Sequence, residues 1–227
     1  MTDVMSLPSA FTLDNIKNVF HDMKYPATFL NTLIATVKGT LGIIVIASMG
    51  GYKMARVKTR YSRFCFLFCI APMMIPFQSF MLTLVNVATT LHINGKIWGL
   101  AIIYWGLGAP MSIFLYQGFA KGIPLELEES ALIDGCNQFQ LFTRIIFPML
   151  KSCTATVTII NVMWIWNDFL LPLLMLGGRK SSKTLQLAAY SFMGQYKMEW
   201  QNIMSAAILI IIPALILYLI FQKSIIK

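Results

Sequence analysis

Five long apolar runs divide this 227-residue chain and leave only short polar segments between them. A helix that crosses a hydrocarbon layer of about 30 Å needs roughly 20 apolar residues. Charged residues make up 12% of the chain, whereas soluble domains carry about a quarter. We therefore predict an all-α, polytopic transmembrane bundle with five spans. The predicted spans are 28–51, 64–86, 97–119, 154–176 and 203–222.

The net charge of +9 fits membrane topology better than nucleic-acid binding. The basic residues form no long run, and no nucleic-acid-binding fold is recognisable. The densest basic cluster lies between two apolar runs, as expected for a short cytoplasmic loop under the positive-inside rule. Its members are Lys53, Arg56, Lys58, Arg60 and Arg63.

This basic loop fixes the orientation of the other segments. With 52–63 inside, the alternation predicts that 120–153 and a short tail, 223–227, are cytoplasmic. The N-terminal segment 1–27 and the segment 177–202 are then extracytoplasmic, as is 87–96. An outside N-terminus with no earlier span is awkward, so we expect either a preceding span that this chain lacks or unaided translocation of 1–27.

Metal, catalytic and ion-coupling sites find no support in the sequence. The four cysteines and two histidines have no ligand-like spacing. No acidic residue occurs between Asp22 and Glu126, although ion-coupled transporters usually carry titratable groups at mid-membrane. Lys38 and Asp168 are the charges near span interiors, and we expect them to face protein or water because each costs about 3 kcal/mol in lipid.

Prolines within or beside the spans predict kinks or broken helices, because each one frees a backbone carbonyl. They are Pro72, Pro76, Pro110, Pro172 and Pro213.

An acidic segment, "PLELEESALIDGCNQFQLFTRIIFP", stands out from the apolar chain. Pro124 suits the first position of a helix, and the glutamates that follow favour the positive end of its dipole. Gly135 supplies a left-handed residue to end this helix. Asn137 and Gln140 then have the spacing of a capping box. The segment predicts helix, glycine turn, helix.

The second helix carries an apolar stripe, and Pro148 would end or kink it near the membrane. We expect the stripe on one face because its members recur at spacings of three and four. Its residues are Phe139, Phe142, Ile146 and Met149. The stripe rests either on the bilayer surface or in a protein groove. The acidic start favours protein, because lipid-bound helices usually carry Lys and Arg.

The same segment resembles the EAA loop of ATP-binding-cassette (ABC) importer permeases, whose pattern is Glu-Ala-Ala, three residues, Gly, nine residues, Ile, one residue, Leu-Pro. The matching positions are Glu129, Ser130, Ala131, Gly135, Ile145 and Pro148, with Asp134 before the glycine. Ser130, Cys136 and Phe147 are mild departures. We call residues 121–152 the EAA loop.

Resemblance extends over almost the whole chain. "WIWNDFLLPLLML" is similar to the Trp-Asn-Asp-Phe run of sugar-importer permeases. "FTLDNIKNVF", "NTLIATV", "GYKMARVKTRYSR", "MMIPFQSFMLTL" and "AAILIIIPALILYLIFQK" are similar to successive parts of the maltose-type G subunit. The resemblance implies a type I ABC importer permease fold in 28–222. It also implies one further span before 1–27 and a Gly-rich basic tail, so we expect truncation at both ends or an unusual start.

The resemblance implies partners as well. A second, F-type permease would complete the pathway, and an extracytoplasmic binding protein would deliver sugar. An ATPase dimer would bind ATP and Mg²⁺ at the cytoplasmic face of a prokaryotic cell membrane. This chain has no GxxxxGK[ST] motif, so we expect it to be a non-enzyme. The coupling residues implied are Glu128, Glu129, Ala131, Asp134, Gly135, Phe139, Phe142, Ile145 and Pro148.

Sugar contacts are predicted from aromatic faces and hydrogen-bonding groups. The candidates are Trp164, Trp166, Asn167 and Asp168, with Gln78, Asn86 and Asn161 as weaker ones. Their alternative role is to pack and cap a span. Two other functions stay open: an importer of another solute, such as a polyamine or phosphonate, and a non-transporting membrane scaffold.

Overall fold

The structure, a computed structural model, describes residues 13–177, 182–193 and 200–221. The predicted cytoplasmic tail 223–227 and the first twelve residues of the segment 1–27 lie outside this range. The described residues are helical and contain two helices long and apolar enough to cross a membrane, or up to four candidate spans if each bent pair counts as one. The all-α prediction is confirmed.

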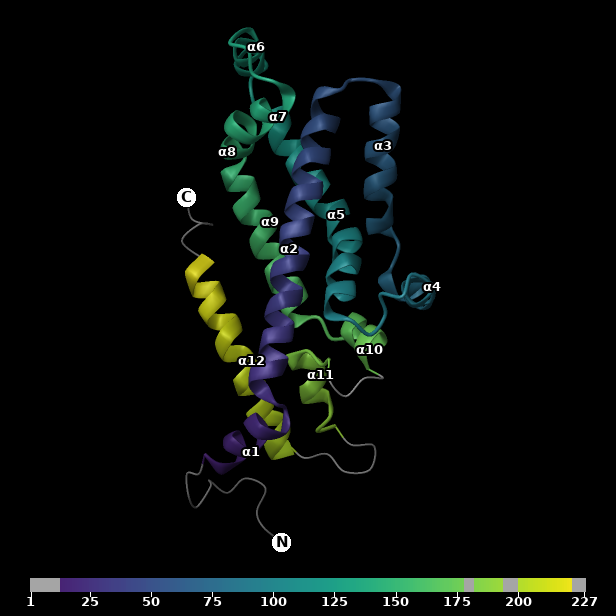
Figure 1. Cartoon of the computed structure of the whole chain (residues 1–227), viewed down its shortest axis with the longest axis vertical. Coiled ribbons are helices and arrows are strands. Elements are labelled where there is room, and N and C mark those ends of the chain that lie inside the picture. Colours follow the sequence, from purple (N-terminus) through teal and green to yellow (C-terminus); the bar gives the residue numbers. More distant parts are fainter. Residues whose placement is uncertain (1–12, 178–181, 194–199, 222–227) are drawn as a thin grey trace.

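Helix α2 (Tyr25–Arg56) and helix α5 (Ile97–Lys121) form the centre of the bundle and run side by side (Figure 1). Small residues bring them together: a Cβ placed on Gly51 would lie 2.7 Å from Cβ of Tyr116. Threonines recur every fourth residue on the buried face of α2, at Thr28, Thr32, Thr36 and Thr40. Small and polar side chains of this kind allow close approach of membrane helices.

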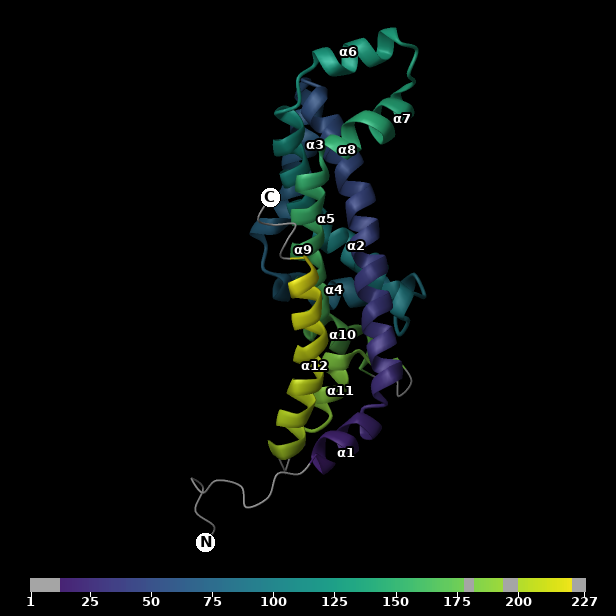
Figure 2. The same cartoon turned by 90° about the vertical axis from the view of Figure 1, so that its left-hand side faces the viewer.

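In the part of the sequence that joins α2 to α5, the chain forms α3 (Arg60–Ile70) and η1 (Ala71–Met74). It then turns into α4 (Phe77–Thr90). The turn is 107°. We predicted one span at 64–86, but Pro76 precedes the first residue of α4 and cannot continue a helix from η1. The α4 helix therefore projects from the side of the bundle (Figure 2).

The second half of the chain starts at the end of the bundle where α5 finishes. Helix α6 (Glu126–Ile133) lies across that end, and the chain returns beneath it (Figure 2). The return consists of α7 (Gln138–Leu141), a π-helical turn η2 (Phe142–Ile146) and α8 (Phe147–Met149).

Helix α9 (Lys151–Asn167) then runs back along α2. We predicted one continuous span at 154–176, but Asp168 and Phe169 interrupt it before α10 (Leu170–Leu176). Asp168 has extended backbone angles at the end of α9. The break places its carboxylate at the start of α10, where it accepts a hydrogen bond from Leu170 N at 3.1 Å.

Of the remaining helices, α11 (Leu185–Tyr190) lies near the end of the bundle that carries α1 (Asp14–Asp22), and α12 (Trp200–Phe221) starts there and runs back along the bundle (Figure 1). Helix α11 is tied to α2 by Leu185 N, which donates to Thr32 Oγ1 at 2.9 Å. Helix α12 packs on α1. On and beside α1, Val19 and Met23 are buried, whereas Leu13 and Phe20 are exposed.

Lys38 lies near the middle of α2 with its side chain on the surface of the chain. Its carbonyl accepts a hydrogen bond from Trp105 Nε1 at 2.8 Å. The expectation that the ammonium group faces protein or water therefore stays a prediction about the assembled protein.

Candidate coupling loop and transmembrane cavity

The EAA loop has the predicted order of helix, glycine turn and helix, although α6 begins at Glu126 and not at Pro124. Gly135 follows α6 with a φ of 86°, a left-handed angle that L-residues with side chains rarely adopt. Asn137 Oδ1 accepts a hydrogen bond from Gln140 N at 2.8 Å, and Gln140 Oε1 accepts one from Asn137 N at 3.0 Å. Helix, glycine turn and capping box are therefore all confirmed.

Glu128 points into the protein. Its Oε1 accepts a hydrogen bond from Arg56 Nε at 2.5 Å, and its Oε2 accepts one from Tyr52 OH at 2.9 Å. Arg56 Nη2 also donates to Ile123 O at 2.9 Å. We call these four residues the Arg56 bridge. It fastens the start of α6 to the end of α2.

The bridge changes the interpretation of two residues. The resemblance implied that Glu128 contacts a partner, but its side chain is largely buried and occupied within this chain. Arg56 was interpreted only as a charge of the basic loop. Its partner lies 72 positions away, and a local pattern carries no signal for so distant a pairing.

A separate set of residues faces outward from the EAA loop. Glu129 and Asp134 are exposed, and Phe139 retains 67% of its accessible surface. Ile133, next to Asp134, is 86% exposed. Ala131 is buried beneath them. The loop therefore presents an acidic and apolar outer surface above a fixed inner side.

The predicted apolar stripe does not lie on one face. Phe142 packs on Tyr52, with ring centroids 5.6 Å apart, and Ile146 is fully buried, whereas Phe139 and Met149 are exposed. The π-helical turn contributes to the difference between Ile146 and Met149, because its wider turn shifts the phase of the side chains towards its end and beyond. Ile145 is partly buried against the core. Pro148 precedes a bend of 75° between 138–149 and α9, which confirms the predicted kink.

Three of the predicted sugar contacts meet in one cavity of about 360 Å³. We call it the Trp164 cavity. Trp164 comes from α9 and Gln78 from α4, while Asp168 comes from the break before α10. The bend at Pro76 is what turns Gln78 toward α9, so the broken span creates the cavity.

Polar contacts order one wall of the Trp164 cavity. Tyr104 OH donates to Asp168 Oδ2 at 2.8 Å, and the Tyr104 ring packs edge-to-face on Trp164 at 5.4 Å. The prediction that Asp168 faces protein is confirmed. Tyr104 was not predicted, because it lies in an apolar run where an aromatic residue is ordinary.

The other sugar candidates lie elsewhere. Asn161 is buried and donates to Ser112 Oγ at 3.1 Å and to Val157 O at 2.8 Å. Trp166 is buried against Phe29, with ring centroids 5.7 Å apart. Both have the packing role that was the alternative. Asn167 lines a separate cavity of about 420 Å³ beside α11 and α12.

Comparison with known proteins identifies the family. Residues 27–227 match the model of the binding-protein-dependent transport system inner membrane component. The chain belongs to this family and is a multi-pass, bacterial inner-membrane permease subunit of an ABC transporter.

Relatives match along nearly the whole chain. The probable starch degradation products transport system permease protein AmyC of Thermoanaerobacterium thermosulfurigenes is 38% identical over 99% of this chain and 81% of the relative. The multiple sugar-binding transport system permease protein MsmG of Streptococcus mutans is 37% identical over 100% of this chain and 82% of the relative.

A solved structure supports the fold. A bacterial ABC transporter involved in the import of the acidic polysaccharide alginate contains a chain that superposes with a TM-score of 0.81. The match covers 98% of this chain and 83% of that chain, at 22% identity. The helical arrangement is therefore that of an ABC importer permease.

Proposed function

We propose that this permease belongs to an ATP-driven importer of sugars or oligosaccharides. It forms one half of the translocation pathway and transmits the movements of an ATPase through the EAA loop. The observation that carries this proposal is the two-sided loop: its inner side is fixed to α2 by the Arg56 bridge, while Glu129 and Phe139 face outward.

The orientation follows from charge. The basic residues of 52–63 lie at the same end of the bundle as the EAA loop (Figure 1), which supports a cytoplasmic position for both. We assign five spans of a type I permease to α2, the bent segment 60–90, α5, α9 with α10, and α12. Helix α1 is then extracytoplasmic.

Coupling works as a lever in this proposal. Phe139 inserts into a groove on the ATPase, and Glu129 makes a polar contact at the rim. When the ATPase closes on ATP and Mg²⁺, the loop moves as one body with the end of α2, because the Arg56 bridge joins them. Helix α2 packs on α5, so the displacement reaches the centre of the bundle and switches its access.

Sugar as the cargo has two supports. The named transport systems of the relatives handle starch degradation products, multiple sugars, and melibiose, raffinose and stachyose. The Trp164 cavity combines an indole face with an amide and a carboxylate, which suit the apolar faces and hydroxyl groups of a sugar. A second, F-type permease, an ATPase dimer and an extracytoplasmic sugar-binding protein complete the importer.

The coupling role is tested by Glu129→Lys and Phe139→Ser in the assembled transporter. Both variants should lose the ATPase in a pull-down through a tag on this chain, and both should lose ATP-dependent uptake. Asp22→Lys, on α1 at the far end, is the control and should retain the ATPase. Full ATPase retention and uptake in both EAA loop variants would refute the docking role.

The cargo is tested by uptake. Cells that lack this chain and cells that carry it are compared with labelled oligosaccharides, a polyamine and a phosphonate. Uptake of an oligosaccharide that depends on the chain supports a sugar importer. If only the uptake of the polyamine or of the phosphonate depends on the chain, the permease transports that solute instead.

A further inference from the structure

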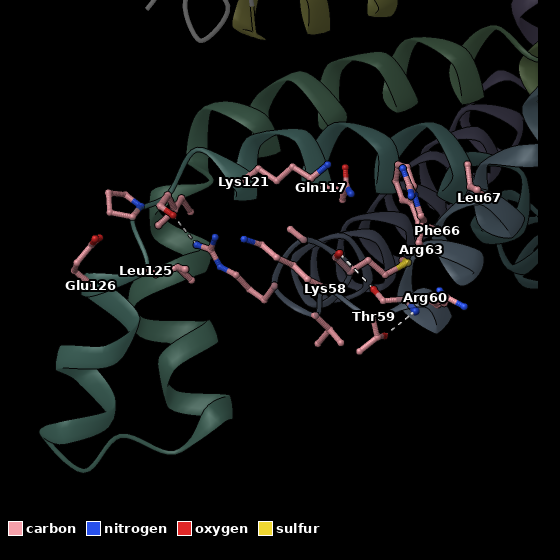
Figure 3. A pocket seen from close by; sticks show the side chains of 17 residues that line it. Lys58, Thr59, Arg60, Arg63, Phe66, Leu67, Gln117, Lys121, Leu125 and Glu126 are labelled. Carbon is pink, nitrogen blue, oxygen red and sulfur yellow. Dashed lines mark hydrogen bonds between the residues drawn. The ribbon is translucent and has the colours of Figure 1, made fainter.

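A cavity of about 1140 Å³ lies between the EAA loop, the end of α2, the start of α3 and the end of α5. Figure 3 shows Lys121 and Gln117 along one side of it, Lys58 and Thr59 opposite, and Arg63 and Phe66 farther from the EAA loop. Arg56 and Ile123 of the Arg56 bridge belong to its lining, but the space itself has no role in the proposed coupling or sugar pathway. We call it the basic cavity.

The basic cavity carries a concentrated positive charge. Five basic residues line it, and within the described part of the chain only Arg56 is paired with a carboxylate. The other four are Lys58, Arg60, Arg63 and Lys121. The one acidic residue in the lining, Glu126, lies at the edge of the view in Figure 3. Four unpaired cations around one space repel each other, and a bound anion relieves that repulsion.

The opening of α3 adds to the preference for an anion. The amides of a helix N-terminus favour negative charge, and α3 begins at Arg60 beside the cations. Thr59 Oγ1 accepts a hydrogen bond from Ser62 N at 3.1 Å, which holds this turn in place.

One wall of the basic cavity is apolar. Met54, Phe66 and Leu67 contribute to the lining, and Leu67 retains 54% of its accessible surface. Cations next to apolar side chains match an amphiphile at the membrane surface, with a charged head and a hydrocarbon body. A free anion would use only the first of these features.

We infer that the basic cavity binds the phosphate headgroup of an anionic phospholipid, with the acyl chains leaving along the apolar wall. Basic pockets between transmembrane helices on the cytoplasmic side suit such headgroups. Lys58 and Lys121 contact the phosphate from opposite sides. The inference relies on the cytoplasmic orientation proposed above, but it does not depend on the cargo or on ATPase docking.

The test measures lipid binding to the intact, detergent-solubilised transporter by native mass spectrometry. Phosphatidylglycerol and phosphatidylcholine with identical acyl chains are titrated separately. The variant is Lys58→Gln with Lys121→Gln. Its matched control is Lys53→Gln with Lys151→Gln, which removes two exposed cations from the same end of the molecule, outside the basic cavity.

We expect phosphatidylglycerol to bind the parent more tightly than phosphatidylcholine, and the cavity variant to bind it about tenfold or more weakly. The control should stay within about twofold of the parent. Equal binding by parent and cavity variant would overturn the inference. So would equal losses in both variants, or equal binding of the two lipids by the parent.

Two further arms separate other anions from the lipid. Binding of inorganic phosphate alone, lost in the cavity variant without any change in phosphatidylglycerol binding, would assign the basic cavity to free phosphate and overturn the inference. Loss of the ATPase from the cavity variant with lipid binding intact would make the cavity a protein contact. Uptake and ATPase retention are recorded in parallel, so a failure of the proposed function is visible separately.

Discussion

Glu128 and Glu129 are neighbours with opposite roles. The side chain of Glu128 is turned inward to Tyr52 and Arg56, whereas that of Glu129 is exposed. Adjacent positions on a helix differ by about 100° in direction, so one side of α6 can be anchored while the next stays free. The acidic start of the EAA loop thus contains an internal anchor and an external contact.

Breaking the Arg56 bridge should destabilise the permease. Arg56→Met or Glu128→Leu alone leaves a largely buried partner charge unpaired, at a cost of about 3 to 5 kcal/mol. The double variant should recover a large part of that loss, because neither charge remains. The measurement is the free energy of unfolding in detergent by denaturant titration.

Lys53→Met is the control for this cycle. Lys53 is exposed one turn before Arg56, and we expect a change within about 0.5 kcal/mol. Single bridge variants as stable as this control would mean that the two charges do not depend on each other.

Sequence patterns predicted residues whose partners lie nearby in the chain. Gly135, Asn137 and Gln140 act within a few positions of one another, and the structure confirms each one. The contacts of Arg56 with Glu128 and of Tyr104 with Asp168 were missed, because they join helices far apart in the chain. Gln78 was a weak candidate until the bend at Pro76 brought it to the Trp164 cavity.

At the scale of helices, the departures from prediction have backbone causes. Hydropathy detects apolar length, and it located the segments at 64–86 and 154–176 as apolar runs. Hydropathy does not report the direction in which the chain runs. It therefore could not show the 107° turn before α4 or the interruption at Asp168. Hydropathy also could not show the π-helical turn at 142–146, which shifts the direction of the apolar side chains that follow it.

Close packing of α2 on α5 depends on Gly51. A Cβ there would lie 2.7 Å from Cβ of Tyr116 and 3.0 Å from Gln117 N, and neither atom can move without moving α5. We expect Gly51→Ala to destabilise the permease by about 1 to 3 kcal/mol, the usual cost of overpacking. The measurement is again denaturant unfolding in detergent.

Gly118→Ala is the matched control, because a Cβ at that position on α5 meets nothing within 4 Å. Alanine is the better helix former by about 1 kcal/mol, so this variant should be neutral or more stable. If Gly51→Ala behaved in the same way, close approach of the two helices would not require the glycine.

Across the whole molecule, two cavities lie at different depths and serve different purposes in our proposal. The Trp164 cavity lies where two broken spans meet, and the basic cavity lies at the end of the bundle that carries the EAA loop. Their linings share no residue, so variants in one can be compared with variants in the other within the same transporter.

A sugar in the Trp164 cavity should depend on Gln78. Gln78→Ala removes one hydrogen-bonding group, and we expect a rise of about tenfold in the KM of ATP-dependent uptake. Asn86→Ala is the control, because Asn86, also a weaker candidate from the sequence, is an exposed amide on the same helix and does not line the cavity. Equal KM values for the two variants would exclude Gln78 as a sugar contact.

Lys38 has a consequence for how the protein is made. An ammonium group on the surface of a central helix is costly in lipid, by about 3 kcal/mol on insertion scales. A newly synthesised chain carries that cost until another subunit or a water-filled space covers the charge. We therefore expect assembly to limit how long the chain survives in the membrane, so that its cellular amount follows the supply of the second permease proposed above.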